Sequence, residues 1–151
     1  MASAIEREFG FSLLELLVVL GLTSVLLTLA VFGHAAARER ISLALAVQQV
    51  AADLHAARAR AVARNREQRL QFTIGGDRYQ PQERNGAAYD DTAAAKPLPS
   101  GIRIRDCTAP GDIISFRPQG GSGSFGSVTL GNASGDVRTV TVSITGRTRI
   151  R

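Results

Sequence analysis

An almost unbroken apolar run near the N-terminus limits what this chain can fold into more than any other feature. It extends from Phe11 to Phe32, and Glu15 is the only charged residue within it. About 20 apolar residues are enough for a helix to cross the hydrocarbon core of a bilayer. We therefore predict a transmembrane helix over residues 11–33.

Glu15 is an unusual residue for such a helix. A carboxylate inside a membrane helix costs roughly 2.5–3.5 kcal/mol on insertion scales. One interpretation is that the side chain reaches the nearby membrane surface, since Glu15 lies only about one turn inside the run. The other interpretation is that a partner compensates its charge.

The residues before the run exclude an ordinary secretory signal. Such a signal has a basic start, an apolar core of about 7–15 residues and a small-residue cleavage site after that core. Here the run is longer, and the small residue Gly10 precedes it. Any cleavage would therefore remove residues 1–10 and leave the apolar helix on the mature chain.

This junction resembles the class III leader of type IV pilins and type II secretion pseudopilins. The string "GFSLLELLVVLGL", which begins at Gly10, is close to the family pattern. In that family a membrane prepilin peptidase cuts after the glycine, the new N-terminal residue is N-methylated, and a glutamate occupies the fifth mature position. The resemblance implies cleavage after Gly10, methylation of Phe11, and filament assembly through Glu15, whose carboxylate can face the N-terminal amine of a neighbouring subunit.

The resemblance also implies where the protein is located and what it contacts. It implies a single-pass protein of the bacterial inner membrane, with a periplasmic C-terminal domain, that joins other pilins or pseudopilins through its N-terminal helix. The basic residues near the span indicate the opposite orientation, because Arg7 precedes it whereas Arg38 and Arg40 follow it. Long translocated domains obey the positive-inside rule weakly, so we follow the resemblance.

Helix-forming residues continue beyond the apolar run. No proline occurs before Pro81, and Ala, Arg, Leu and Gln dominate up to Arg69. Apolar residues recur at steps of three and four, and Asp53, Arg60 and Arg64 fall away from this stripe. The stripe consists of Leu43, Val47, Val50, Leu54, Ala57 and Ala61. We predict one helix over residues 11–68 whose second half packs on a sheet.

The remaining residues, 69–151, are predicted to form an antiparallel β domain, which makes the fold class α+β. Alternating apolar residues and turn signals predict strands over 70–74, 102–105, 113–116, 128–130 and 137–144. Prolines and turn residues predict a long loop over residues 81–100. Residues 121–126 match G-x-G-x-x-G in letters, but no helix pattern follows, so we expect a flexible hairpin loop there and no dinucleotide site.

The sequence offers no catalytic or metal-binding constellation. Its two histidines, His34 and His55, lie 21 residues apart on the predicted helix. Cys107 is the only cysteine, so no internal disulfide can form and we expect a buried thiol. We therefore expect no enzyme activity, no cofactor and no metal.

The C-terminal tail carries three regularly spaced arginines. Arg147, Arg149 and Arg151 would share one face of a strand, about 6.6–6.8 Å apart. The opposite, inward face would carry Val140, Val142, Ile144, Thr148 and Ile150. Guanidinium groups bind phosphates in bidentate fashion, so the tail suits DNA or another anion without reading sequence. The alternative is an edge strand protected from aggregation by outward charge.

The C-terminal third also resembles a narrower branch of the same family. The stretches "ISFRPQGGSGSFGSVTL" and "VTVSITGRTRIR" are similar to the H-type minor pseudopilins (GspH) of type II secretion and to FimT/FimU-like minor pilins, whose domain commonly ends in Gly-Arg-x-Arg. The first resemblance implies a structural subunit at or near the tip of the pseudopilus that supports protein export. The alternative is a FimT-like pilin that binds DNA for natural transformation through Arg147, Arg149 and Arg151.

Overall fold

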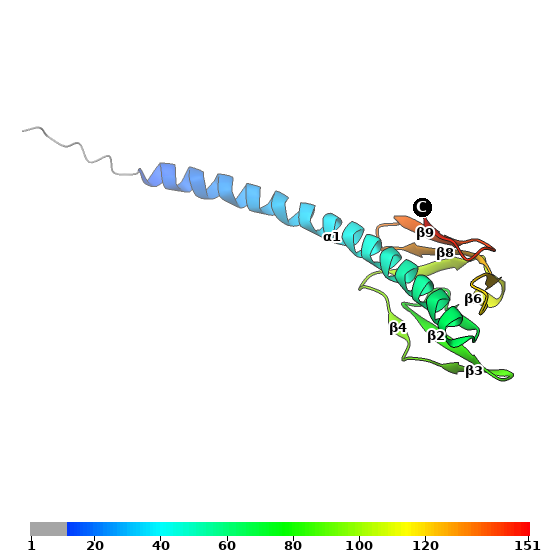
Figure 1. Ribbon diagram of the computed structural model, residues 1–151. Coiled ribbons are helices and arrows are strands. Elements are labelled where there is room, and N and C mark those ends of the chain that lie inside the picture. The colour runs from blue at the N-terminus through cyan, green and yellow to red at the C-terminus, as the bar shows by residue number, and fades with distance from the viewer. Residues whose placement is uncertain (1–11) are drawn as a thin grey trace, which may run out of the picture. The chain divides into compact units, whose positions relative to one another are not determined.

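The computed structural model describes the backbone of residues 12–151 and the side chains of this range except residues 30–37. The chain divides into two compact units, residues 1–36 and residues 37–151. Helix α1, Leu13–Arg64, contributes to both units (Figure 1). Gly10 and Phe11, the predicted cleavage and methylation site, lie outside the described residues.

The first half of α1 exposes nearly all of its apolar side chains. Its large apolar residues between Leu13 and Leu29 are 49–77% exposed. The hydroxyl groups of Thr23, Ser24 and Thr28 donate hydrogen bonds to backbone carbonyls three or four residues earlier, so the helix itself satisfies these polar groups. Among the residues that were described, no helical segment is both long and apolar enough to span a membrane. The predicted transmembrane segment over residues 11–33 stays a prediction.

A left-handed residue ends α1 four residues before the predicted boundary. Asn65 has φ 50°, and its amide donates to the carbonyl of Val62 while the amide of Arg66 donates to the carbonyl of Ala61. This pair of bonds is the Schellman arrangement, in which a glycine or asparagine after the last turn satisfies the final carbonyl groups. Asn65 is therefore the residue that stops the helix.

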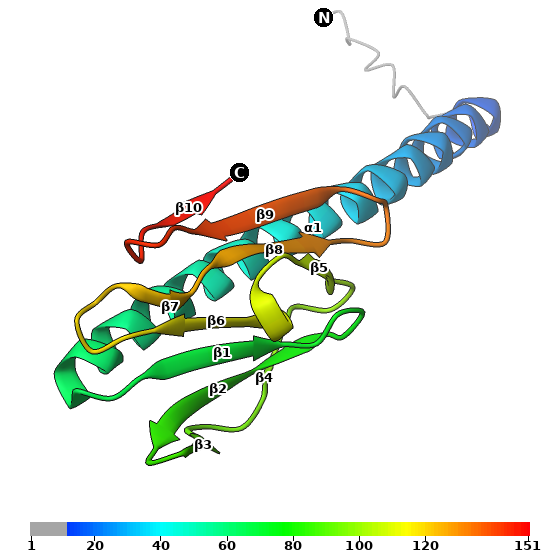
Figure 2. The ribbon, with the colours of Figure 1, turned by 90° about the vertical axis from the view of Figure 1, so that its right-hand side faces the viewer.

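Two antiparallel sheets form the β part of the second unit (Figure 2). The first has the order β3-β2-β1-β6-β7, with β4 also paired to β2, and the second has the order β10-β9-β8-β5. The strands of the first sheet are β1 (Gln68–Phe72), β2 (Arg78–Asn85), β3 (Ala88–Asp91), β4 (Lys96–Pro97), β6 (Ile113–Phe116) and β7 (Ser122–Ser124). Those of the second are β5 (Arg103–Cys107), β8 (Gly126–Gly131), β9 (Val137–Val142) and β10 (Thr148–Ile150), and a short 3₁₀ helix, η1 (Pro110–Asp112), precedes β6.

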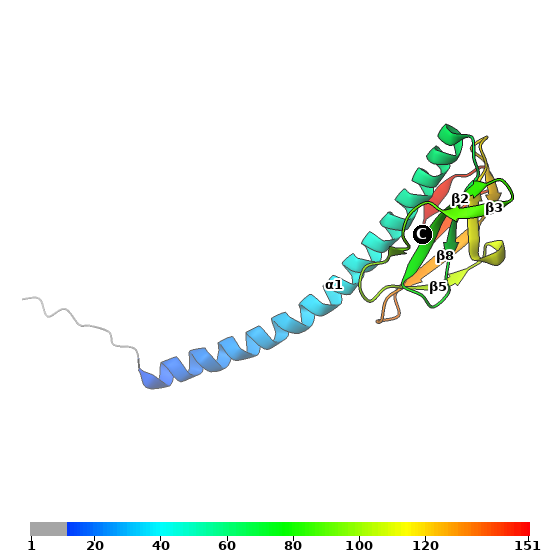
Figure 3. The ribbon, with the colours of Figure 1, turned by 90° about the horizontal axis from the view of Figure 1, so that it is seen from below.

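The second half of α1 packs its apolar stripe against both sheets. All six predicted stripe residues are buried, at 0–3% exposure, which confirms the predicted packing face. The strands lie on one side of this half of the helix, as Figure 3 shows. Buried side chains from both sheets, including Phe72, Phe116, Ile104 and Leu130, complete a single core. The α+β prediction is confirmed.

The prediction of a long loop over residues 81–100 was wrong. Strand β2 continues through Pro81 to Asn85, and β3 and β4 follow. Asn85 pairs with Ala88, so only Gly86 and Ala87 connect β2 and β3, and Gly86 has φ 66°. A glycine in the first position of a two-residue turn is a hairpin signal. Pro81 lacks an amide donor, but neither β3 nor β4 pairs with this residue, and its carbonyl accepts a hydrogen bond from the amide of Thr92.

The prediction of a flexible loop over the glycine-rich residues 121–126 was also wrong. Ser122–Ser124 forms β7 against β6, and β8 begins at Gly126. A Cβ atom at Gly126 would lie 2.6 Å from the amide nitrogen of Ala109, and one at Gly123 would lie 2.6 Å from Oγ of Ser115. These glycines permit close backbone packing, which is a structural reason for the motif.

Three further expectations concern single side chains. Cys107 is buried as expected, and burial raises the pKa of its thiol. Two isoleucines were expected to point inward but are exposed: Ile150, at the end of the edge strand β10, is 45% exposed, and Ile144 is 65% exposed. For Ile144 the reason is that β9 ends at Val142 and a turn follows, which interrupts the alternation before Ile144.

Candidate functional site

The three tail arginines lie on one face of the second sheet. Strand β10 pairs with β9 so that Thr148 is opposite Val142 and Ile150 is opposite Val140. Paired residues of antiparallel strands share a face, and the two valines belong to the core. Arg149, which lies between Thr148 and Ile150, therefore faces away from the core, as the alternation predicted. Arg147 and Arg151 flank β10, are exposed and line the same hollow as Arg149. We call the surface of Arg147, Arg149 and Arg151 the arginine face.

A hollow of about 490 Å³ adjoins the arginine face. Besides the three arginines it is lined by Ser127, Thr141, Ser143 and Thr145. The hydroxyl oxygens are bonded in two pairs, Ser127 with Thr141 and Ser143 with Thr145, each at 2.9 Å. No acidic side chain lines the hollow, and within the described residues none of the three arginine side chains forms an ion pair. The surface thus presents three guanidinium groups beside four hydroxyl groups.

Gly146 fixes the start of this tail against α1. It has φ 77°, and a Cβ atom at this position would lie 2.7 Å from the carbonyl oxygen of Gly120 and 3.1 Å from Nε of Arg58. Arg58 itself donates from Nε to the same carbonyl at 2.8 Å. At the other end of the tail, Arg151 exchanges two backbone hydrogen bonds with Thr139. The arginine face is therefore held in the sheet at both ends.

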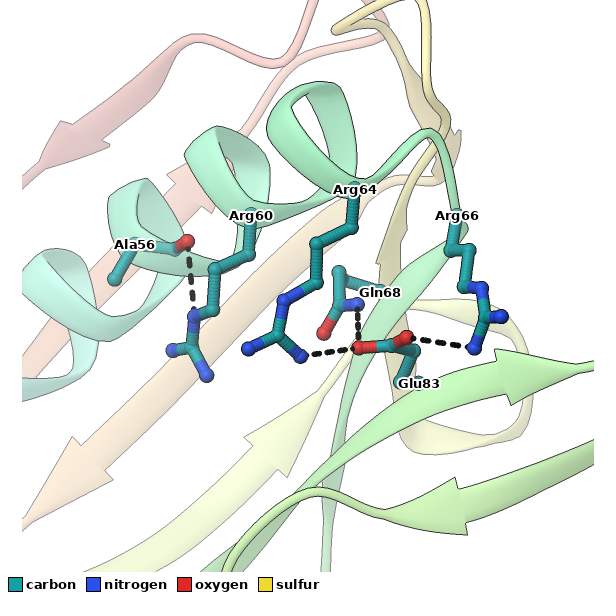
Figure 4. A network of polar contacts seen from close by, with 6 residues as sticks. All are labelled: Ala56, Arg60, Arg64, Arg66, Gln68 and Glu83. Atoms are coloured by element: carbon teal, nitrogen blue, oxygen red, sulfur yellow. Dashed lines mark hydrogen bonds and ion pairs between the residues drawn. The ribbon is translucent and has the colours of Figure 1, made fainter.

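A second polar cluster joins the end of α1 to the first sheet (Figure 4). Glu83 is only 8% exposed and accepts hydrogen bonds from Gln68 at 2.7 Å, Arg64 at 2.8 Å and Arg66 at 3.3 Å. The Gln68 amide, followed by the Arg64 guanidinium, holds the pKa of Glu83 below its ordinary value. In the same view Arg60 donates separately, to the carbonyl of Ala56.

A third cluster joins the middle of α1 to β2 and β4. Asp53 accepts hydrogen bonds from the Tyr79 hydroxyl and from Lys96 Nζ, the latter at 2.6 Å. Gln49 donates to the carbonyl of Pro97 at 2.9 Å. Burial, and secondarily the Asp53 carboxylate, raises the pKa of Tyr79. The only lysine of the chain thus fastens β4 to the helix.

Sequence analysis missed the functions of Asp53 and Arg64 in these two clusters. The sequence pattern placed both away from the apolar stripe, whereas in the structure they bond to strand residues 26 and 19 positions further along the chain. The helical period alone gave no sign of these contacts. A charged residue on a helix that covers a sheet either points to solvent or finds a partner on that sheet.

The other candidate residues are not brought together. Glu15 is exposed in the first turn of α1, and no ion pair or side-chain hydrogen bond joins it to another described residue. His55 is exposed, and the side chain of His34 lies outside the described residues. Over the same part of the chain, no group of three His, Cys, Asp or Glu residues could hold a metal ion.

The end of α1 and most of the β domain match one known family. The family model for the type II transport protein GspH matches residues 46–146, well over half of the chain. This chain belongs to the GspH family. In addition, residues 7–31 of the GspH-family chain match the prokaryotic N-terminal methylation motif. No curated protein sequence matches it.

Two solved structures share the fold of this GspH-family chain. Both are of the minor pseudopilin EpsH from the type II secretion system of Vibrio cholerae. The first has 10% sequence identity and a TM-score of 0.61, with 72% of this chain and 92% of that chain covered. The second has 11% identity and a TM-score of 0.61, with 73% and 96% covered. At this identity the likeness shows the fold alone.

The findings together support a minor pseudopilin of the type II secretion system. The family and the methylation motif imply assembly with other pseudopilins, processing by a prepilin peptidase and a membrane-anchored pseudopilus. The family is a structural one.

Proposed function

We propose that this GspH-family protein is a structural subunit at or near the tip of a type II secretion pseudopilus, where it supports protein export. The observation that carries the proposal is the exposed apolar first half of α1. Contiguous exposed apolar surface of this extent marks a site for lipid or protein contact. The helix would lie in the inner membrane over residues 11–33 before assembly and against neighbouring subunits afterwards, with the β domain in the periplasm.

Glu15 is the residue we propose for assembly. It lies in the first turn of α1 and has no charged partner among the described residues. The matched methylation motif supports an N-terminal amine at Phe11 after cleavage at Gly10. A neighbouring subunit's amine could then pair with the carboxylate and offset the cost of placing it in an apolar environment.

Two measurements test this proposal in cells that produce the pseudopilus. Mass spectrometry of the membrane-extracted protein should find methylated Phe11 as the first residue, whereas an intact Met1 contradicts the processing step. Cross-linking should then show that Glu15→Gln is processed and inserted but fails to join the pseudopilus. Glu39→Gln, which changes the other glutamate of α1, serves as the control and should assemble normally. Assembly of Glu15→Gln at the native level would refute the assigned role.

A second candidate function is non-specific DNA binding by a FimT-like minor pilin. The specific observation in its favour is the hollow beside the arginine face, which is lined by three arginines and no acidic side chain. Duplex DNA presents regularly spaced phosphates, and protein groups that neutralise them give strongly salt-dependent affinity.

The test is DNA binding by the full chain in non-ionic detergent at several salt concentrations. Arg147→Ala with Arg149→Ala should weaken binding and reduce the salt slope by about 0.9 for each phosphate that is no longer neutralised. Arg60→Ala with Arg138→Ala removes the same charge elsewhere and should have a much smaller effect. Equal effects of the two double variants would exclude the arginine face as a DNA site.

A further inference from the structure

A second arginine-lined hollow, of about 450 Å³, lies where α1 ends. Three segments that are distant in sequence contribute to it: the turn after α1, the β2–β3 hairpin and the residues after β6. Each supplies one guanidinium and one amide side chain. These are Arg66 and Asn65, Arg84 and Asn85, and Arg117 and Gln119. We call this hollow the α1-end pocket.

The charges of the α1-end pocket are mostly compensated. Arg66 pairs with Glu83 at 3.3 Å, and Arg84 pairs with Glu67 at 3.4 Å. Arg117 is exposed and, within the described residues, forms no ion pair and no side-chain hydrogen bond. Glu83 also pairs with Arg64, so its single charge is shared between two guanidinium groups. The pocket therefore has an excess of positive charge, and Arg117 is the arginine of the three that has no carboxylate partner among the described residues.

The backbone that carries Arg117 is fixed. Its amide donates to the carbonyl of Gly121, and its carbonyl accepts from the amide of Gly120, both at 2.9 Å. Arg58 of α1 donates to the carbonyl of Gly120 and so holds this turn against the helix. The base of the Arg117 side chain is thereby positioned, although its guanidinium lies in solvent.

The wall of the pocket limits the kind of anion that fits. Glu67 lines it, so a dianionic phosphate would face a carboxylate as well as the guanidinium groups. A single carboxylate would compensate the excess charge and accept a bidentate pair of hydrogen bonds from one guanidinium. The three amide side chains can bond to the polar groups of a peptide backbone.

We propose that the α1-end pocket binds an acidic side chain presented by a peptide segment of a partner protein, with Arg117 as its principal contact. This site is separate from Glu15 and from the arginine face, and it does not depend on either proposed function. Its ligand is a monoanionic carboxylate in a peptide, whereas the arginine face suits an anion with several charges.

The test uses the full chain in non-ionic detergent and NMR of the arginine Nε–Hε groups. The probes are an acetylated, amidated Gly-Gly-Glu-Gly-Gly peptide, the same peptide with Gln in place of Glu, and inorganic phosphate. The Glu peptide should shift the Arg117 signal and bind several-fold more tightly than the Gln peptide or phosphate. Arg117→Gln should weaken its binding about tenfold, the effect expected for one charge-assisted contact.

Two further variants make the outcome decisive. Arg149→Gln removes one charge from the arginine face and should change Glu-peptide binding less than about twofold, whereas an effect equal to that of Arg117→Gln indicates general attraction and overturns the site. Glu67→Gln should strengthen phosphate binding, since it removes the charge that disfavours a dianion.

Three further results would overturn the proposal: equal binding of the Glu and Gln peptides, tighter binding of phosphate than of the Glu peptide to the native chain, or undiminished binding of the Glu peptide by Arg117→Gln. Backbone amide spectra verify that each variant is folded, and the methylation and cross-linking results do not bear on this outcome.

Discussion

The two halves of α1 differ in how much of their apolar surface is buried. In the first half, the large apolar side chains from Leu13 to Leu29 are 49–77% exposed, whereas the stripe from Leu43 to Ala61 in the second half is 0–3% exposed. Both halves are helical, so the difference does not come from backbone conformation. It comes from whether the chain itself supplies a partner for the apolar surface.

The pattern of side chains explains this difference. The first half is apolar on all sides, which is typical of a helix surrounded by lipid or by other helices. The second half has one apolar stripe and polar residues elsewhere, which is typical of a helix that covers a sheet. The second half therefore contributes to the stability of the folded domain, whereas the first half leaves its apolar surface free for contacts with other molecules.

The largest expected effect is on the free energy of unfolding, and it should differ between the two halves of α1. Leu54→Ala should lower the free energy of unfolding by about 2–5 kcal/mol, since Leu54 is fully buried and its removal leaves a cavity. Leu26→Ala is the matched control and should leave it unchanged, because Leu26 is 65% exposed. Denaturant unfolding of the full chain in detergent measures both. Equal decreases would show that the first half is also part of the folded core.

The second expected effect compares a glutamate that has partners within the chain with one that has none among the described residues. Glu83→Gln should lower the free energy of unfolding by about 1–3 kcal/mol, because it weakens charge-assisted bonds to Arg64 and Arg66 at the end of α1. Glu15→Gln should leave domain stability unchanged while it blocks assembly. Denaturant unfolding measures both variants. If Glu15→Gln destabilises the domain, the functional separation of the two halves is wrong.

The smallest effect is the pH dependence that Glu83 contributes. Its pKa is lower in the folded chain, mainly because Gln68 and Arg64 donate hydrogen bonds to the carboxylate. The stabilisation is therefore complete above the unfolded-state pKa of about 4.3 and is lost as pH falls through the folded-state pKa. Unfolding measured from about pH 6 down to about pH 3 should show a steeper acid destabilisation for the native chain than for Glu83→Gln. Identical profiles would contradict this contribution.

Local patterns in the sequence predicted much of the second unit. The stripe of α1 has the helical period, and the alternation of Val140 and Val142 with Thr141 has the strand period, so each could be assigned from residues close in sequence. The same alternation correctly placed Arg149 opposite the core. It failed at Ile144, because a turn interrupts the strand and no local period indicates where pairing ends.

The missed strands pair with strands that are close in the sequence, so the error concerned turn length and not distant partners. Strand β2 pairs with β1 on one side and with β3 on the other, and Pro81 lies opposite Leu70 of β1. Strand β7 exists because β6 pairs with it and because Gly123 permits close approach to Ser115. Turn-forming residues alone do not distinguish a tight hairpin from a long loop, since the distinction lies in the pairing on either side.

The sequence by itself determined the apolar run with its single Glu15, the packing stripe of the helix and the alternating arginines of the tail. Each of these features depends only on residues close in sequence and on a fixed helical or strand period, so it can be predicted without knowing the tertiary fold. Only the tertiary structure decided that Arg66, Arg84 and Arg117 line one pocket and that Glu83 pairs with two arginines. Charges from separate elements converge only when the strands are paired, and their distances then decide which are neutralised and which stay available to a partner.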